Sequence, residues 1–573
     1  MWVYGERSRN ADPRALLAEV EARLGALAAM PPGLERHTAL VAAFILAGEL
    51  AQGLADAELE ALGHDDLTPL QQAAMEWLTG LAGAVASSWR SRFAPVDPLP
   101  PAAELAALNL PSHVTTRTGE GYAFYAVYPE SYLEAATRAG FDRPPMVIGL
   151  RSIGTGLAAL VAAATGAEPP VTLRPTGHPF HREVRVSEAL EAHLRARASG
   201  RFAVVDEGPG LSGSSLGAVG DLLERLGVPE DRIDWFPSHA GDLGPEADPR
   251  HRARWARARR HVVDFDALCL VRDASFPLAR WFEDLTGPAV EPLRDISGGA
   301  WRDLRADGAG LPAHPGQERR KLLLTTGRGR FLLKFAGLGP GAEAKFARAR
   351  ALHAEGFTPE PLALRHGFLL ERWIEGARPL DPSANRPALV DCLGRYLGFR
   401  ARAFPAGPGD GAAPDDLAEM IRVNASEALD PASGERLSGR FRALIAGAPP
   451  ARPVHIDGRL HGWEWLRLRD GRLLKTDALD HSNAHDLIGC QDIAWDVAGA
   501  VVEFGCTDEE AEDLHRRVEQ LGGGAISSAY VEALRLAYAA FQVGLWSLAT
   551  DPGARKPREV YRAELARSGV GQR

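Results

Sequence analysis

Short apolar runs alternate with helical segments between residues 145 and 239, and this alternation constrains the fold more than any other feature. The apolar runs are PMVIGL, RFAVVDEG and RIDWFPSH, and the stretches GLAALVAAATGA and SLGAVGDLLERLG separate them. Such an alternation predicts βαβ units and a parallel sheet. Because ligands of these sheets bind beyond the carboxyl ends of the strands, the residues after each run are candidate site residues.

The pattern changes on both sides of this region. Helical stretches such as DPRALLAEVEARLGALAAM fill the chain up to about residue 95, and proline-rich FAPVDPLPPAAEL follows as a linker. After residue 287, strand-like runs such as RFLLKF come first and helices follow. We therefore predict a multidomain chain, with an N-terminal α-helical bundle over 1–105, an α/β domain with a parallel sheet over 106–287, and an α+β bilobal domain over 288–573.

The bulk composition favours a cytoplasmic protein with small-molecule ligands. The chain has 573 residues and a formal net charge of -10, which argues against broad binding to nucleic acid or to an anionic membrane. Its four cysteines form no metal or disulfide pattern, so we expect free thiols in a reducing compartment. The most apolar helical stretch carries Glu49 and is short of a membrane span, and no signal peptide is expected. For the N-terminal helices we expect a packing or dimerisation role, which leaves a homo-oligomer open.

The stretch FAVVDEGPGLSGSS places two acids and a loop of small residues at the end of one apolar run. Glycine lets a backbone approach a phosphate closely, serine hydroxyls donate hydrogen bonds, and the helix that follows offers its N-terminal N–H groups. The two acids suit ribose hydroxyls or a Mg²⁺ ion. The candidate residues are Asp206, Glu207, Gly208, Gly210, Ser212, Gly213, Ser214 and Ser215. A generic nucleotide-binding α/β domain is the alternative.

This stretch resembles the phosphoribosyl-diphosphate (PRPP) binding motif of type I phosphoribosyltransferases, over about residues 112–285. The segments EGYAFYAVYP, RPTGHPFHRE and VDEGPG resemble those of a bacterial phosphoribosyltransferase-like branch linked to tellurite-resistance gene neighbourhoods. The resemblance implies that Asp206 and Glu207 bind ribose and metal, and that the earlier loop VIGLRSIGTG and the basic segment RPTGHPFHRE bind pyrophosphate. The residues so assigned are Arg151, Ser152, Gly154, Thr155, Gly156, Arg174 and Arg182.

A second acidic segment begins at PVHIDGRLHGWEW and continues to QDIAWDVAG. It resembles the catalytic loop and metal-binding hairpin of aminoglycoside-phosphotransferase-like kinases, whose pattern reads H-G-D-x-H-x-x-N and then a hairpin ending in Asp. The resemblance implies that Asp457 is the catalytic aspartate, that His455 braces the loop, and that Asp477, with Asp480 as its rival, binds metal. Asp492 and Asp496 would buttress the loop. The family's asparagine falls at Gly462, unless an insertion of two residues places Glu464 there as a metal ligand.

The preceding strands fit the same resemblance, which covers about residues 288–560. Gly298 and Gly299 in DISGGAW resemble a turn over phosphates, and Lys334 in RFLLKF matches the lysine that holds the ATP phosphates. Glu343, in the next helix, would pair with that lysine. Glu371 lies in LLERWIEG, which would receive the adenine.

Together these features predict a bifunctional transferase that uses Mg²⁺, PRPP and ATP. It would form or cleave a ribosyl glycosidic bond and phosphorylate a hydroxyl of a nucleoside-like small molecule. A regulatory protein that senses a nucleotide through a pseudokinase domain is the alternative, and Gly462 with Glu464 is the feature that separates the two. In a third hypothesis only one domain is catalytic and the other tethers or channels its product.

Overall fold

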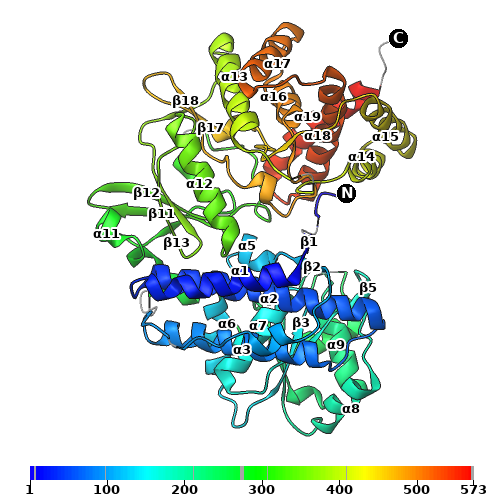
Figure 1. The fold of residues 1–573 in the computed structure, drawn as a ribbon. Coiled ribbons are helices and arrows are strands. Elements are labelled where there is room, and N and C mark those ends of the chain that lie inside the picture. The colour runs from blue at the N-terminus through cyan, green and yellow to red at the C-terminus, as the bar shows by residue number, and fades with distance from the viewer. Residues whose placement is uncertain are drawn as a thin grey trace.

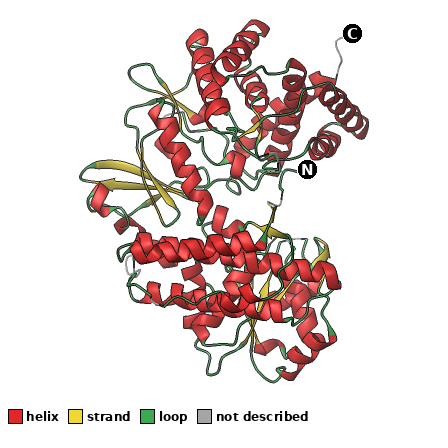
Figure 2. Cartoon of the chain, in the orientation of Figure 1, coloured by secondary structure: helices red, strands yellow, loops and turns green. Residues whose placement is uncertain are grey.

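The computed structural model describes residues 1–5, 8–96, 98–210, 212–244, 246–271, 276–305, 307–407 and 409–569. The first half of the chain forms the lower body in Figure 1, and the second half forms the upper body. A mixture of helices and a central sheet fills the lower body, whereas the upper body has a strand-rich end and a helical end (Figure 2).

The parallel sheet that the alternation predicts is present in the first half. Its strands are β3 (Met146–Leu150), β4 (Val171–Leu173), β7 (Phe202–Val205), β8 (Ile233–Phe236) and β9 (Arg259–Arg260), in the order β4-β3-β7-β8-β9. Every neighbouring pair is parallel. Strand order reverses between β3 and β7, so the ends of these two strands border the crevice where open α/β sheets bind ligands.

Most helices of this half pack around the sheet, whereas the last one, α11 (Glu283–Thr286), lies against Arg328 and Arg365 of the second half (Figure 1). The others are α4 (Ala103–Ala107), α5 (Glu120–Phe124), α6 (Pro129–Ala139), α7 (Gly154–Thr165), α8 (Glu188–Ala196), α9 (Ser214–Arg225) and α10 (Pro249–Arg257). A small hairpin, β5 (Thr176–His178) with β6 (His181–Glu183), stands between β4 and β7.

The N-terminal helices belong to the same packing unit as this sheet. They are α1 (Pro13–Ala26), α2 (Leu34–Leu62) and α3 (Pro69–Arg90), and α2 and α3 pack against α7. Strand β1 (Ser8–Ala11) pairs with β2 (Val114–Arg117), across the predicted boundary at residue 105. Their apolar side chains share one hydrophobic core with the sheet. The first two predicted domains therefore do not pack as separate bodies.

Helix α2 is longer than the sequence led us to expect. By length and composition it is the one helix among the described residues that could cross a membrane, with a mean hydropathy of 1.6 over its most apolar window. In this structure 83% of that window is buried inside the protein, and the core helix of a globular protein meets the same criteria.

The second half begins with an antiparallel sheet and continues with helices. The sheet order is β10 (Arg294–Asp295), β11 (Lys321–Thr326), β12 (Gly329–Phe335), β14 (Phe368–Arg372) and β13 (Pro361–Arg365). The helix α12 (Pro340–Ala354) connects β12 to β13. The helical end contains α13 (Arg386–Ala403), α14 (Pro414–Ala428), α15 (Pro431–Ala446), α16 (Ala494–Phe504), α17 (Asp508–Gly522), α18 (Ser528–Leu548) and α19 (Arg555–Gly569).

Two small sheets join these ends. Strands β15 (Arg378–Pro379), β17 (Trp465–Arg467) and β18 (Leu473–Lys475) form one, and β16 (Pro453–Val454) pairs with β19 (Gln491–Asp492) in the other. The helical end has its own core, whereas the inner face of the β10–β14 sheet, including Phe335 and Phe368, packs into the core of the first half.

Gly149 lies in the interior strand β3, where it allows the close approach of the helix α7. A Cβ atom at Gly149 would overlap the carbonyl oxygen of Gly154 and lie 2.7 Å from the Cβ atom of Ala158. We expect Gly149→Ala to lower the free energy of unfolding by about 1–3 kcal/mol, measured by urea denaturation, because the helix α7 must shift. In the control Gly25→Ala, near the end of α1, the new Cβ meets no atom within 4 Å, so stability should stay unchanged or rise. Equal stability of both variants would contradict the packing described for β3 and α7.

Candidate functional site

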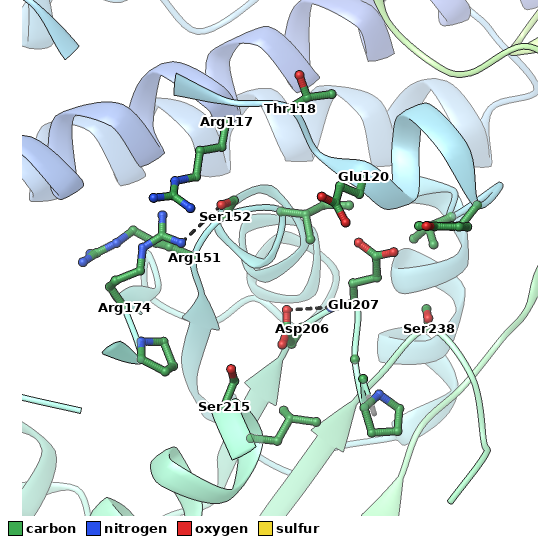
Figure 3. A pocket seen from close by; sticks show the side chains of 18 of the residues that line it. Arg117, Thr118, Glu120, Arg151, Ser152, Arg174, Asp206, Glu207, Ser215 and Ser238 are labelled. Carbon is green, nitrogen blue, oxygen red and sulfur yellow. Dashed lines mark hydrogen bonds between the residues drawn. The ribbon is translucent and has the colours of Figure 1, made fainter. Parts of the chain in front are cut away.

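A cleft of about 1450 Å³ opens at the carboxyl ends of β3 and β7. Arg151 and Ser152 follow β3, and Asp206 and Glu207 follow β7. The loop from Ser212 to Ser215 leads into α9 and completes this side of the cleft. Figure 3 shows the arginines on one side and the carboxylates Glu120, Asp206 and Glu207 on the other. The cleft therefore brings together the strand ends that the sequence singled out.

The surroundings of the two acids after β7 disfavour the ionised form of their carboxyl groups. Asp206 Oδ1 accepts a hydrogen bond from the Glu207 N–H at 2.8 Å, and Glu207 Oε2 accepts one from the Gly121 N–H at 3.0 Å. Burial raises the pKa of Asp206 to about 7. Burial, together with the nearby carboxylates Glu120 and Asp206, raises the pKa of Glu207 to about 8. A bound cation would lower both pKa values, since an opposite charge favours the ionised form.

The arginine after β3 lines the cleft, but two carboxylates hold its guanidinium. The Arg151 side chain is 0% exposed, and its guanidinium pairs with Asp56 of α2 at 2.9 Å and with Asp65. It also donates to the Thr172 hydroxyl at 3.1 Å. Because its charge already has these partners, the contact of Arg151 with pyrophosphate stays a prediction. The peptide bond between Arg151 and Ser152 is cis.

Arg174 is closer to the cleft. It pairs with Asp56 and donates to the Ser152 hydroxyl at 3.2 Å, and its side chain is 13% exposed (Figure 3). The acids Asp56 and Asp65 lie about 90 residues or more from these arginines in the chain, and the sequence reasoning missed them. It also missed Glu120, although EGYAFY was singled out as a motif.

The remaining residues of the first loop begin the helix α7. Gly154, Thr155 and Gly156 are buried, and none of them is among the residues that line the cleft. A Cβ at Gly156 would meet the Tyr122 hydroxyl and the Phe44 ring. We therefore correct their predicted phosphate contact to a role in packing, and the residues of this turn that reach the cleft are Arg151, Ser152 and Ile153.

The serine loop and the small hairpin contact each other. The Ser212 and Ser214 hydroxyls donate to the Pro179 carbonyl at 2.9 and 2.6 Å. Gly213 precedes α9 with a φ of 59°, a left-handed conformation that glycine adopts easily. In the hairpin, Arg182 donates to the Pro175 carbonyl at 3.1 Å. Gly208, Gly210, Ser215 and Arg182 all line the cleft.

A second cavity of about 320 Å³ lies between the β10–β14 sheet and the helical end of the second half. Lys334 is buried beside it and donates to Asp477 Oδ1 at 2.6 Å while pairing with Asp480. Burial opposes the charge of Lys334, but Asp477 and Asp480 outweigh it and hold its pKa above the usual range. Lys334, Asp477 and Asp480 are therefore brought together beside this cavity, and their contacts with ATP and metal stay predictions.

The predicted pairing of Glu343 with Lys334 is wrong. Glu343 is exposed on α12, and the charged residues of this helix that are buried are Lys345 and Arg348. Lys345 donates to the Ala336 carbonyl at 2.7 Å and lies 3.2 Å from Asp480. Burial lowers the pKa of Lys345 to about 8.

Two further predicted ATP contacts lie at or near the rim of this cavity. Glu371 of β14 lines it, and burial raises the pKa of Glu371 to about 7. Gly298 and Gly299 form a turn after β10 with φ values of 60° and 90°. Ile296 and Trp301, on either side of that turn, line the cavity.

Asp457, the predicted catalytic aspartate, is 1% exposed and does not line the cavity. The Tyr396 hydroxyl donates to its carboxylate, and Lys475 Nζ lies 3.6 Å away. Burial opposes its charge, but Lys475, His481 and Arg400 hold the pKa of Asp457 well below its usual range. Asp496 accepts hydrogen bonds from the N–H groups of Asp457 and Gly458 at 2.7 and 2.9 Å, so it does buttress the loop.

Four residues of this loop line the cavity: Arg459, His461, Trp463 and Glu464. Arg459 donates to Gln317 Oε1 at 3.2 Å and pairs with Asp486. The kinase pattern H-G-D-x-H-x-x-N can also be placed two residues later, where Gly458 and His461 match its glycine and second histidine. In that register Asp457, Arg459 and Glu464 stand in place of its first histidine, aspartate and asparagine. Asp457 is buried, and its catalytic role stays a prediction.

Glu464 lies beside the other predicted metal ligand. Ligand atoms of Glu464, Asp477 and His481 all fall within 4.8 Å of one another. Lys475 donates to Glu464 Oε2 at 2.6 Å. The braces predicted around the loop lie further away: His455 contacts the Cys490 sulfur at 3.2 Å, and Asp492 accepts from the Ala494 N–H at 3.0 Å.

The same segments of the second half contribute residues to both cavities. Arg320 lines the first cleft, and its neighbour Lys321 lines the second cavity. Asp480 and His481 line the second cavity, and His485 Nε2 lies 3.0 Å from Glu120 of the first cleft. Adjacent residues of the second half thus reach both sites.

Comparison with known proteins gives a likeness over about half of the chain. No protein-family model and no curated protein matches it. Among solved structures, a choline/ethanolamine kinase family protein from Mesorhizobium loti is 19% identical and covers 50% of this chain and 90% of its own, with a TM-score of 0.32. The choline kinase LicA from Streptococcus pneumoniae is 15% identical over 43% of this chain and 89% of its own, with a TM-score of 0.32. The spectinomycin phosphotransferase APH(9)-Ia, in complex with ADP and spectinomycin, is 13% identical over 51% and 93%, with a TM-score of 0.34.

The surroundings of Asp457 make its replacement a test of stability. We expect Asp457→Asn to lower the free energy of unfolding by about 3 kcal/mol, since it leaves the buried Lys475 with one carboxylate fewer. Urea denaturation monitored by tryptophan fluorescence would measure this. Asp470→Asn, on the exposed turn of the same hairpin, is the matched control and should leave the midpoint nearly unchanged. A stable Asp457→Asn variant that merely loses phosphoryl transfer would support the catalytic role.

Proposed function

We propose that the first cleft transfers a phosphoribosyl group from a PRPP-type donor. The observation that carries this proposal is the position of Asp206 and Glu207, which face the serine loop and the N-terminus of α9 at the point where strand order reverses. A helix N-terminus with hydroxyls suits the 5-phosphate, and the acidic pair suits the ribose hydroxyls.

A Mg²⁺ ion fits this acidic pair. The raised pKa values of Asp206 and Glu207 reflect carboxylates with few compensating cations, and oxygen ligands are those that Mg²⁺ prefers. When bound, the ion would neutralise charge on the diphosphate. The chain's own residues would orient the sugar: Asp206 and Glu207 would hold its hydroxyls, and Ser215 would donate to its phosphate. Ser212 and Ser214 would join Ser215 by exchanging their hydrogen bonds to the Pro179 carbonyl for the phosphate.

The reaction exchanges one bond at the anomeric carbon for another. The bond to the diphosphate oxygen breaks, the diphosphate leaves with the electron pair, and a nitrogen or carbon acceptor forms the new bond; the reverse reaction cleaves it. Arg174 and Arg182 line the side of the cleft where the diphosphate would lie, and their charge would stabilise it as it leaves.

For the second cavity we propose binding of Mg²⁺–ATP. Lys334 would exchange its contacts with Asp477 and Asp480 for the phosphates, and Glu464, Asp477 and His481 offer ligand atoms for the metal. Phosphorylation of a hydroxyl on a nucleoside-like small molecule would complete a bifunctional enzyme, and it requires a base, the role predicted for Asp457. The second candidate, nucleotide sensing without transfer, requires no base, and the entry of Arg459 into the cavity favours it.

Calorimetry with PRPP and Mg²⁺ tests the first cleft. We expect the affinity to rise at least about tenfold between pH 6 and pH 8.5, because the cation competes with protons whose pKa values lie near 7 and 8. The double variant Asp206→Asn with Glu207→Gln should bind weakly at every pH. The matched control neutralises the acids at the other end of the sheet, Glu230→Gln with Asp231→Asn, and should keep the wild-type profile. Unchanged affinity in the first double variant would remove the assignment.

Binding and turnover of Mg²⁺–ATP test the second cavity. Lys334→Ala should weaken ATP at least about tenfold, the loss of roughly 1.4 kcal/mol of binding free energy. Lys556→Ala, which removes an exposed lysine of α19, is the control. If wild type binds ATP yet phosphorylates nothing in a metabolite extract, sensing is supported. A phosphorylated product would support the bifunctional enzyme, and ATP binding unaffected by Lys334→Ala would refute the site.

A further inference from the structure

Three metal-ligating side chains meet in the core, away from both cavities. His37 comes from α2, Glu130 from α6, and His366 from the turn between β13 and β14. Their exposed fractions are 0%, 0% and 1%. His37 Nε2 lies 2.7 Å from Glu130 Oε1, and His366 Nε2 lies 3.2 Å from the same oxygen. The cluster therefore joins the N-terminal helices to the sheet of the second half.

The outer nitrogen of each imidazole contacts a hydroxyl. His37 Nδ1 lies 2.9 Å from Ser88 Oγ, and His366 Nδ1 lies 3.3 Å from Thr38 Oγ1. These contacts orient both rings so that the Nε2 atoms face the same carboxylate. A hydrogen-bond partner on the outer nitrogen is the usual arrangement of histidines that bind metal through the inner one.

The inner atoms are under-used by hydrogen bonds. Within the described parts of the chain, Glu130 Oε2 has no hydrogen-bond partner although it is buried, and His366 Nε2 faces only Glu130 Oε1, at 3.2 Å. A buried polar atom without a partner is costly, so native proteins rarely leave one. An ion bound by the carboxylate and the two imidazoles would satisfy Glu130 Oε2.

His366 is the first residue of the two-residue turn between β13 and β14. His366 and Gly367 have φ values of 42° and 85°, as a tight hairpin turn of this length requires. The Tyr128 hydroxyl donates to the His366 carbonyl at 2.7 Å and holds the turn in place. The rings of Tyr128, Trp281 and His37 pack around the imidazole. The turn thus places the imidazole among aromatic rings.

We propose that His37, Glu130 and His366 bind one divalent transition-metal ion, and that this ion is zinc. Two imidazole nitrogens and the two oxygens of Glu130 supply four donor atoms, the number that Zn²⁺ takes in structural sites. Nitrogen ligands disfavour Mg²⁺ and Ca²⁺, which take oxygen. Because the site is closed to solvent, its role is structural: the ion fastens α2 and α6 to the β13–β14 turn.

Metal analysis of the full-length chain tests this proposal. After expression with added zinc and dialysis against metal-free buffer, we expect one zinc per chain by mass spectrometry of the digested metal. Glu130→Gln and His366→Gln should lose it and unfold at a lower temperature. His113→Gln removes an exposed histidine, and His481→Gln removes one from the cluster at the second cavity, so both should keep the zinc.

A measurement on the wild type covers the case in which the buried variants fail to fold. Chelator-stripped protein should regain its melting temperature when one equivalent of Zn²⁺ is added, and Co²⁺ should give the visible absorption of a four-coordinate site. Less than about a tenth of an equivalent of metal, with no thermal shift on adding zinc, would overturn the proposal in favour of a hydrogen-bonded His–Glu–His cluster. Zinc that is lost in His481→Gln and kept in His366→Gln would place the ion elsewhere and overturn it equally.

Discussion

A single hydrophobic core runs from the N-terminal helices, along one face of the parallel sheet, to the inner face of the β10–β14 sheet. Both predicted domain boundaries, near residues 105 and 287, lie within segments that this core connects. It fixes the strand ends of β3 and β7 relative to β11 and β12, and therefore fixes the two cavities relative to each other. The placement of Arg320 at one cavity and of its neighbour Lys321 at the other depends on it.

The buried charged groups of the two cavities differ in whether the protein itself provides them with an oppositely charged partner. In the first cleft Arg151 and Arg174 are paired with Asp56 and Asp65, and within the described residues Asp206 and Glu207 form no ion pair. In the second cavity the acids Asp477 and Asp480 already hold Lys334. The first cleft is thus arranged to accept a cation, whereas in the second cavity a ligand must displace an existing ion pair.

The sequence predicted local features well and long-range partners poorly. Alternating apolar runs predicted the parallel sheet, and the position after such a run placed Asp206 and Glu207 in a cleft. No local pattern shows that Arg151 is paired with Asp65, which is 86 residues away in the chain. On α12, polar residues occur on several faces, so spacing could not tell the exposed Glu343 from the inward Lys345. In the loop at 455–464, the sequence motif selected Asp457 as the aspartate. The structure shows that Asp457 is buried and that Arg459 lines the cavity.

The aromatic contacts between the two halves bear on whether separate genes could encode them. Tyr128 packs on Phe335, and Phe265 stacks on Phe368 with ring centroids 5.3 Å apart. A gene cut near residue 287 would encode two products whose large aromatic rings face water, and exposed apolar patches of this kind promote aggregation. Neither product would be a soluble starting point for separate evolution. Selection would therefore keep the two halves as one reading frame, even where only one of the two cavities is in use.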